Sequence, residues 1–203
     1  MKENKYDDNI FFQKYSQMSR SQQGLAGAGE WETLRKLLPD FKDKRVLDLG
    51  CGYGWHCIYA MEHGASSVVG VDISHKMLEV AKEKTHFPQV EYKCCAIEDV
   101  EFPEESFDVI LSSLAFHYVA DYEILVKKIY RILKSGGKLV FTVEHPVFTA
   151  YGTQDWHYNE KGEILHFPVD NYYYEGKRTA VFLGEKVTKY HRTLTTYLNT
   201  LLS

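Results

Sequence analysis

The sequence predicts an α/β protein with a doubly wound, mostly parallel sheet. From residue 45 onward, short apolar segments typical of strands alternate with segments of helical periodicity, which indicates successive βαβ units. A Gly-x-Gly-x-Gly turn at Gly50, Gly52 and Gly54 directly follows the first apolar segment. Asp72 ends the second one, where a doubly wound sheet places a carboxylate against a ribose.

The individual elements follow from periodicity and from the residues that begin and end helices. Apolar and aromatic positions suggest helical structure over 8–19, and Ser21 is expected to begin a helix that runs to Leu38 and stops before Pro39. Strands are predicted at 45–50, 67–72, 90–95, 107–112 and 138–144, and helices at 54–63, 75–84 and 121–134. Ser74 is the expected cap of the second of these helices, and Gly136-Gly137 is expected to form a turn.

The pattern changes after His145. Residues 146–175 are rich in Tyr, His, Trp and Asn and show little periodicity. Segments 172–179 and 186–191 could pair as an antiparallel hairpin around Gly184, and 193–202 reads as an amphipathic helix. We therefore expect one domain over 1–203, made of a helical N-terminal cover (1–43), a cofactor-binding core (44–145), an aromatic-rich insertion on the substrate side (146–192) and the start of a C-terminal helix (193–203).

Composition limits the classes of function. The chain has 203 residues, a formal net charge of −4 and 44% hydrophobic residues, as in a soluble globular domain. It has no apolar run long enough for a transmembrane helix and no leader-like N-terminus, so we expect a cytoplasmic protein that does not contact a membrane. The absence of a basic stripe disfavours nucleic acid as a partner. The spacing of the four cysteines indicates neither a disulfide framework nor a metal site.

The glycine turn and Asp72 together predict a cofactor that contains adenosine, either a dinucleotide or S-adenosylmethionine. A dinucleotide site usually has Gly-x-Gly-x-x-Gly, whereas here the third glycine comes one residue early and Trp55 occupies the usual position. Asp48 also lies two residues before the first glycine. A carboxylate there would repel a pyrophosphate, but it suits an ammonium or sulfonium group. These residues favour S-adenosylmethionine.

Five segments in order then resemble the class I S-adenosylmethionine-dependent methyltransferases, in the small-molecule branch called type 11. The segments are VLDLGCGYG (46–54), VVGVDIS (68–74), AIEDVEF (96–102), SFDVILSSLAFHYV (106–119) and ILKSGGKLVFTVEHP (132–146). The resemblance covers about half the chain and implies a Rossmann-like methyltransferase fold. Because that fold normally ends with two further strands, we expect a sheet that lacks its last two strands through C-terminal truncation.

The resemblance also implies roles for individual residues. Asp48 is expected to accept a hydrogen bond from the methionine ammonium, directly or through water, and Asp72 to bind both ribose hydroxyls. Ile73, Ile97 and Glu98 would surround the adenine, although relatives often carry a carboxylate where this chain has Cys94 to Ala96. The remaining predicted cofactor contacts are Gly50, Cys51, Gly52, Gly54, the Leu114 carbonyl, and Tyr15 and Arg20 over the methionine end.

Methyl transfer needs an aligned nucleophile in a dry site, and an oxygen nucleophile also needs a base. His117 and His145 follow neighbouring strands and are the candidate bases. Aromatic residues at 151, 156 and 172–174 are candidates for the acceptor pocket.

A small-molecule acceptor is the favoured partner, since SSLAF stands where nucleic-acid base methyltransferases carry Asn/Asp-Pro-Pro-Tyr, and either a monomer or a homodimer is compatible with the sequence. Two alternatives stay open: a non-catalytic S-adenosylmethionine-binding regulator, and an NAD-dependent oxidoreductase.

Overall fold

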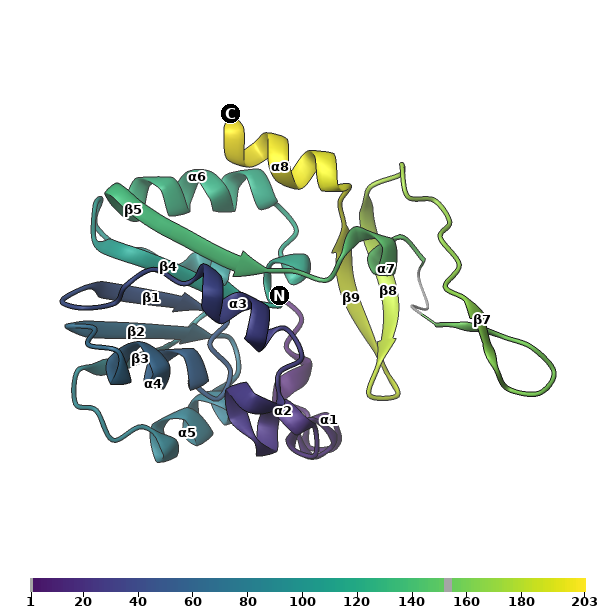
Figure 1. Ribbon diagram of the computed structural model, residues 1–203, viewed down its shortest axis with the longest axis horizontal. Helices are drawn as coiled ribbons and strands as arrows, with labels where there is room; N and C mark the ends of the chain where they lie inside the picture. Colours follow the sequence, from purple (N-terminus) through teal and green to yellow (C-terminus); the bar gives the residue numbers. More distant parts are fainter. Residues whose placement is uncertain (1, 152–154) are drawn as a thin grey trace.

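A parallel sheet forms the centre of the molecule. The computed structural model describes residues 2–151 and 155–203 (Figure 1). Among these residues, five strands form this sheet in the order β3-β2-β1-β4-β5, and all four neighbouring pairs are parallel. The strands are β1 (Arg45–Leu49), β2 (Ser67–Asp72), β3 (Val90–Cys94), β4 (Phe107–Ser113) and β5 (Leu133–Thr142). The predicted doubly wound fold is therefore confirmed, with β1 and β4 adjacent at its centre.

Helices cover both faces of the sheet because successive side chains of each strand point to opposite sides. Leu47 and Leu49 of β1 belong to the core that includes Leu125 and Ile129 of α6 (Tyr122–Ile132). Val46 belongs to the opposite core, which includes residues of α4 (Trp55–Glu62) and α5 (His75–Lys84). Both faces are thus apolar, as expected for a buried parallel sheet. Ser74 caps α5 through the Met77 amide, as predicted.

The prediction of one helix over 21–38 is wrong. This region contains α2 (Ser19–Gln22), the 3-10 turn η2 (Gly24–Gly27) and α3 (Trp31–Leu37). Gly24 has φ +63°, and a Cβ on Gly27 would lie 2.3 Å from the Ser19 carbonyl oxygen. A residue with the φ of Gly24 cannot lie inside a continuous α-helix, and the close approach of Gly27 to Ser19 shows that the chain folds back here. The folded segment lies over the glycine turn.

Two further short helical segments precede this region. They are η1 (Lys5–Asp7) and α1 (Asn9–Ser16), and Asp8 caps α1 by accepting hydrogen bonds from the Ile10 and Phe11 amides. The predicted cover over 1–43 is accordingly made of several short pieces rather than long helices.

The turn predicted at Gly136-Gly137 is also wrong. Both glycines lie within β5, which begins directly after α6 ends at Ile132. Gly136 has φ +75°, and the β4–β5 register shifts between Phe107 and Val109. The glycines therefore form an irregularity in the strand rather than a connection before it.

The C-terminal part contains small elements beside the main sheet. They are α7 (Pro146–Ala150), β6 (His157–Tyr158), β7 (Ile164–His166), β8 (Gly176–Phe182), β9 (Glu185–His191) and α8 (Leu194–Leu202). The predicted hairpin is confirmed as β8–β9, which turns at Leu183 and Gly184. Helix α8 lies beside α6, where the rings of Tyr122 and Tyr197 are 4.9 Å apart. Residues 152–154 of the predicted insertion, and Met1 of the predicted cover, lie outside the described residues.

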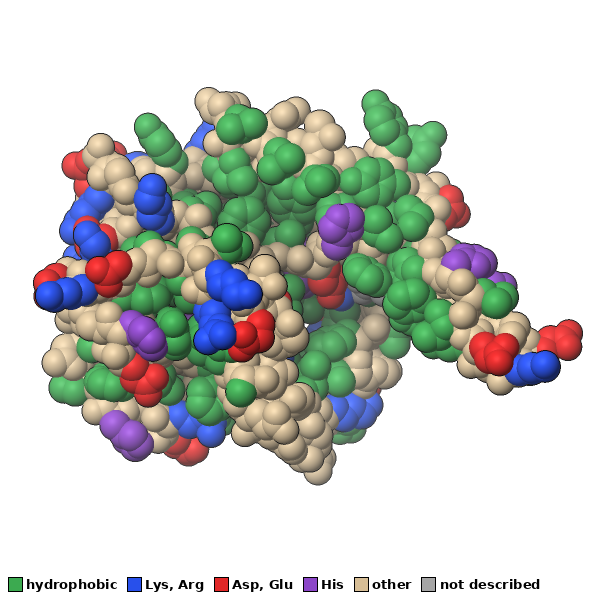
Figure 2. All heavy atoms as spheres, viewed as in Figure 1, with side chains coloured by type: hydrophobic (Ala, Val, Ile, Leu, Met, Phe, Trp, Pro, Cys, Tyr) green, Lys and Arg blue, Asp and Glu red, His purple; other side chains and the backbone are tan. Residues whose placement is uncertain are grey.

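The β6–β7 hairpin projects away from the core (Figure 1), and hydrophobic side chains gather along the segment that carries it (Figure 2). Trp156 packs edge-on against Phe167, while Ile164 and Leu165 are exposed. Of the tyrosines predicted to face the acceptor, Tyr173 and Tyr174 are exposed to solvent, and the Tyr172 hydroxyl accepts a hydrogen bond from the Leu194 amide at the start of α8.

Candidate active site

The three glycines of the turn have different structural roles. All three have positive φ, at +79° for Gly50, +52° for Gly52 and +75° for Gly54. A Cβ on Gly50 would lie 2.5 Å from the Ala115 Cβ, and one on Gly54 would lie 2.2 Å from the Tyr92 hydroxyl oxygen. A Cβ on Gly52 would meet nothing within 4 Å. Gly50 and Gly54 are therefore required by packing, and Gly52 leaves open space for a ligand.

Asp72 joins this turn to the next helix. Its carboxylate accepts hydrogen bonds from the Gly52 amide and the Ser74 amide, both at 2.9 Å. Burial raises the pKa of Asp72, and these two hydrogen bonds oppose the rise. Because each carboxylate oxygen can accept a second hydrogen bond, Asp72 retains capacity for a diol.

Asp48 is less accessible than the sequence suggests. Its side chain is 0% exposed, and one oxygen accepts a hydrogen bond from the Cys57 thiol at 3.5 Å. The other oxygen has no hydrogen-bond partner among the described residues. Burial raises the pKa of Asp48 to about 7, and the charge of Asp72 adds to this rise. An uncompensated acceptor of this kind is costly, and it is suited to a nearby positive charge.

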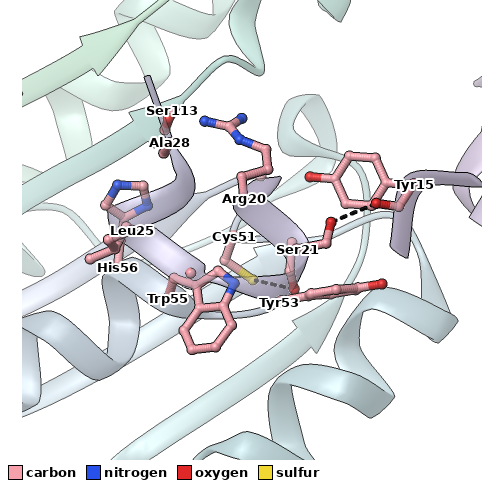
Figure 3. A pocket seen from close by; sticks show the side chains of 13 residues that line it. Tyr15, Arg20, Ser21, Leu25, Ala28, Cys51, Tyr53, Trp55, His56 and Ser113 are labelled. Atoms are coloured by element: carbon pink, nitrogen blue, oxygen red, sulfur yellow. Dashed lines mark hydrogen bonds between the residues drawn. The ribbon is translucent and has the colours of Figure 1, made fainter. Parts of the chain in front are cut away.

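A pocket of about 470 Å³, part of which is open to solvent, lies over the turn (Figure 3). We call it the glycine-turn pocket. Its lining comes from three parts of the chain. The N-terminal cover contributes Tyr15, Arg20, Ser21, Gly24, Leu25 and Ala28. The turn and α4 contribute Gly50, Cys51, Gly52, Tyr53, Trp55 and His56, and the end of β4 contributes Ser113. The predicted contacts Tyr15, Arg20, Gly50, Cys51 and Gly52 therefore lie together.

A polar chain crosses this pocket. Arg20 forms an ion pair with Glu30, and the same Glu30 oxygen accepts a hydrogen bond from the Ser113 hydroxyl at 3.0 Å. Burial lowers the pKa of His56 to about 4, so its ring is neutral at physiological pH. The Trp55 indole N–H is buried and has no partner among the described residues. The pocket thus presents the Arg20 cation to a ligand, and the Glu30 carboxylate lies beside it, paired with Arg20.

The predicted adenine contacts lie beyond Asp72, beneath the N-terminal segment. The Ile97 Cδ1 atom would be 3.4 Å from a Cβ on Gly50, so Ile97 lies over the turn. The Ile73 carbonyl accepts a hydrogen bond from the Asn4 side chain at 3.1 Å, and Lys2 lies 3.9 Å from Glu98 and 2.6 Å from Asp99. Residues 2–8 therefore cover this end of the site.

Leu114 has the conformation expected for a tight strand exit. Its φ is +53°, and its amide donates to the Thr142 carbonyl at 2.9 Å. A bulky residue with positive φ is strained and is often found at functional sites. The strain turns the chain directly after Ser113, at the edge of the glycine-turn pocket.

His117 and His145 do not line the glycine-turn pocket. His117 is 2% exposed, and burial lowers its pKa to about 4. Its Nδ1 accepts a hydrogen bond from the Glu144 amide at 3.4 Å. His145 is exposed and caps α7, where its Nδ1 accepts from the Val147 amide at 3.2 Å. A neutral imidazole has one acceptor nitrogen, and in both residues that nitrogen faces a backbone N–H.

Sequence reasoning missed Glu30, His56 and Asp7. Asp7 accepts hydrogen bonds from the Ser74 hydroxyl at 2.6 Å and from the Lys76 amide at 3.1 Å, and so it tethers the N-terminal segment to α5. The Gly27-Ala28-Gly29 sequence before Glu30 was the one available signal, since it argues against a continuous helix there.

The polar groups of the site fit S-adenosylmethionine. Asp48 has an unsatisfied buried acceptor, Gly52 leaves open space, and Arg20 and Glu30 match the two charges of an amino acid. Across residues 2–151 and 155–203, no cluster of three His, Cys, Asp or Glu side chains could hold a metal ion. In the same residues, no helix is long and apolar enough to cross a membrane.

Comparisons with known proteins agree with this geometry. Residues 47–141 match the family model for the methyltransferase domain named Methyltransf_11. The structure is similar to a candidate S-adenosylmethionine-dependent methyltransferase of Listeria monocytogenes, with 58% identity and a TM-score of 0.82 over 86% of this chain and 82% of that one. It is also similar to an S-adenosylmethionine-dependent methyltransferase of Mesorhizobium loti, with 41% identity and a TM-score of 0.81 over 88% of this chain and 81% of that one.

A more distant relative carries a named role. The chain is 36% identical over 112 residues to the ubiquinone biosynthesis O-methyltransferase of Coxiella burnetii, a match that spans 54% of this chain and 47% of that protein. Taken together with the site, these similarities show that the chain belongs to the S-adenosylmethionine-dependent methyltransferase family. Its cofactor is S-adenosylmethionine, as the glycine turn predicts.

Proposed function

We propose that this chain transfers a methyl group from S-adenosylmethionine to a small organic acceptor by in-line displacement. One observation carries the proposal: the glycine-turn pocket lies beneath the N-terminal cover, which contributes six of its lining residues. An acceptor has to fit beside that cover, and this geometry favours a small molecule over a macromolecule.

The residues at the site have separate binding roles in this proposal. Asp72 binds the ribose diol, Gly52 allows close approach to the backbone, and Arg20 binds the methionine carboxylate. Asp48, which is fully buried, stabilises the positive end of the methionine part from beneath through water. Tyr15, whose pKa burial raises, stays protonated and closes the pocket on the N-terminal side. Ile73, Ile97 and Glu98 border the adenine.

In this proposal, positioning of the acceptor accounts for most of the acceleration of methyl transfer. When bound, S-adenosylmethionine supplies a methyl carbon that its sulfonium has already made electrophilic. The protein then needs to hold the acceptor in line with that carbon and to exclude water. Tyr15 and Tyr53, whose ring centroids lie 5.9 Å apart at 90°, give the pocket an aromatic wall beside the turn.

His117 and His145 remain the proposed bases for an oxygen acceptor. In each residue, the hydrogen bond that Nδ1 accepts from a backbone N–H would first have to break. The low pKa of His117 also makes it a weak base near neutral pH, where a catalytic base works best with a pKa close to the ambient value. We therefore favour His145 of the two.

Charge and one relative support a small organic acceptor. The net charge of −4 gives no electrostatic attraction to nucleic acid. The Coxiella relative is named for O-methylation in ubiquinone biosynthesis, which involves a small molecule. We propose the same broad class of acceptor here, without extending that protein's substrate to this chain.

Binding of S-adenosylhomocysteine, measured by titration calorimetry, tests the cofactor site. We expect Asp72→Asn to weaken binding at least tenfold, because a neutral amide has one acceptor oxygen to offer two ribose hydroxyls. Asp40→Asn, on an exposed loop residue, is the matched control and should bind like wild type. Equal affinities for Asp72→Asn and wild type would refute the ribose role.

Transfer of a labelled methyl group to a panel of small phenols, amines and thiols tests the activity. Methylation of any member supports an enzyme that acts on small molecules. Saturable S-adenosylhomocysteine binding without transfer to any class of acceptor would favour the non-catalytic regulator instead.

A further inference from the structure

Glu30 has an unusual environment for a residue at the start of a helix. It precedes α3, yet its side chain does not cap that helix. Instead its carboxylate contacts the Arg20 guanidinium and the Ser113 hydroxyl, both of which belong to residues that line the glycine-turn pocket. The Glu30 carboxylate therefore lies beside two pocket-lining residues, although Glu30 is not itself part of the lining.

The amino-acid end of S-adenosylmethionine carries one ammonium and one carboxylate group. Arg20 lines the glycine-turn pocket and presents a guanidinium, and Glu30, which pairs with Arg20 beside the pocket, presents a carboxylate. The side chains of both residues are 23% exposed, so neither charge is fully screened by water. In the structure the two side chains form an ion pair with each other. The carboxylate of a bound amino acid would match Arg20, and its ammonium would match Glu30.

The acid of the glycine motif is poorly placed to bind the ammonium directly. Asp48 is fully buried, and its pKa of about 7 leaves much of it protonated at neutral pH. Glu30 differs in both respects. Burial tends to raise its pKa, but hydrogen bonds and the charge of Arg20 outweigh this and lower the pKa of Glu30 below its ordinary value. Glu30 is therefore ionised at neutral pH.

Ser113 connects Glu30 to the strand exit. Its hydroxyl donates to Glu30, and it precedes Leu114, whose backbone turns sharply at the edge of the pocket. β4 pairs with β1 in parallel, so the exit of β4 lies beside the start of the glycine turn. A group bound at Glu30 consequently lies between the N-terminal cover and the carboxyl ends of the two central strands.

We propose that Glu30 is the direct acceptor for the methionine ammonium, and that Arg20 exchanges Glu30 for the methionine carboxylate when the cofactor binds. This inference rests on the proposed function and goes one step further, because it assigns a cofactor-binding role to a residue outside the glycine motif. The ion pair between Arg20 and Glu30 holds both side chains in place before binding, which lowers the entropic cost of ordering them.

Three ligands separate the possible roles of Glu30. They are S-adenosylhomocysteine, its deaminated analogue, which keeps the carboxylate, and its decarboxylated analogue, which keeps the ammonium. Each is titrated by calorimetry into wild type, Glu30→Gln and the matched control Glu32→Gln. Glu32 lies two residues away, is exposed and pairs with Arg35, so its substitution makes the same chemical change outside the pocket.

We expect Glu30→Gln to weaken S-adenosylhomocysteine and the decarboxylated analogue by a similar factor of at least about ten, the size expected for a charged hydrogen bond. The deaminated analogue should bind wild type and Glu30→Gln within about twofold. Glu32→Gln should match wild type with all three ligands. Circular dichroism and thermal melting show whether Glu30→Gln is folded, and Glu30→Asp, which keeps the charge on a shorter side chain, should recover part of the lost affinity.

Two outcomes overturn the inference alone. If Glu30→Gln weakens the deaminated analogue and spares the decarboxylated one, Glu30 only positions Arg20. If it affects none of the ligands, Glu30 has no binding role; in both cases wild-type binding of S-adenosylhomocysteine leaves the proposed function standing. A wild-type chain that binds none of the three ligands refutes the proposed function together with the inference.

Discussion

At the scale of single residues, Asp48 shows how burial changes the meaning of a motif. The sequence places an acid where a cation is expected, and the structure buries that acid completely beside Cys57. The pKa of about 7 compares with an ordinary value near 4. Asp48 thus carries a proton in the free protein over a pH range in which an exposed carboxylate is ionised.

The pKa of Asp48 predicts a pH dependence of stability. Because the folded state holds this proton more tightly than the unfolded state, the contribution of Asp48 is fully present below about pH 4 and is lost as the pH rises to about 7. We expect Asp48→Asn to remove this decline, so its stability relative to wild type should increase between pH 4 and 7. Urea unfolding of both proteins at several pH values measures this difference in stability. A constant difference across this range would contradict the raised pKa.

The proton on Asp48 should also be detectable through cofactor binding. A cation bound near Asp48 lowers its pKa, so wild type should release a fraction of a proton on binding S-adenosylmethionine near pH 6.5, and Asp48→Asn should release none from this site. Calorimetry in buffers of different ionisation enthalpy measures the released proton.

At the scale of elements, the N-terminal segment and α5 act as one unit. Asp7 reaches the first turn of α5, where its carboxylate accepts from Ser74, His75 and Lys76. Burial alone would raise the pKa of Asp7, but these hydrogen bonds lower it below its ordinary value. An acid at the start of a helix also interacts favourably with the helix dipole. The tether holds residues 2–8 over the proposed adenine end of the site.

Asp7→Asn should loosen this tether. We expect a loss of about 1 kcal/mol in stability, the usual value of a helix cap, and faster dissociation of S-adenosylhomocysteine. Stopped-flow dissociation and hydrogen exchange of residues 4–8 measure the two effects. Asp170→Asn, an exposed acid in the C-terminal part, is the control. An unchanged dissociation rate with faster exchange would show that residues 2–8 do not cover the cofactor.

At the scale of the whole molecule, α1 connects the cofactor side to the β8–β9 hairpin. Phe11 is 0% exposed and packs with Ala180 and Val187, and the Lys14 ammonium donates to the Leu183 carbonyl at 2.9 Å. Residues about 170 positions apart in the chain therefore form one small core. The hairpin also carries Lys189, which pairs with Glu144 at the exit of β5.

Phe11→Ala should separate these parts without dissolving the central sheet. A buried Phe-to-Ala change costs about 3–5 kcal/mol where the site cannot collapse. We expect faster hydrogen exchange in both α1 and the β8–β9 hairpin, with β1 and β4 remaining protected.

Phe12→Ala is the matched control for this change, because Phe12 is only partly buried and contacts Tyr53 instead of the hairpin. Faster exchange in α1 with an unchanged hairpin would show that the two elements are independent.

The sequence by itself determined the parallel sheet, the glycine turn, the place of Asp72 at the end of the second strand, and the class of cofactor. The strands and the glycine turn depend on residues within a few positions of one another, and Asp72 follows the turn at the spacing of one βαβ unit. Periodicity, turn chemistry and motif spacing are therefore sufficient to reveal them. The capping of α5 by Ser74 and the β8–β9 hairpin around Gly184 were predictable for the same reason.

Only the tertiary structure decided the rest of the site. The chain breaks at Gly24, which has a left-handed φ of +63°, and Gly27 packs so closely on Ser19 that a Cβ would lie 2.3 Å from its carbonyl oxygen. Neither feature is visible in a local pattern. That break brings Glu30 to Arg20 and Ser113, and long-range packing likewise buries Asp48 and His117. Burial and charge pairing depend on distances across the fold, and these distances set which groups are ionised and which can meet a ligand.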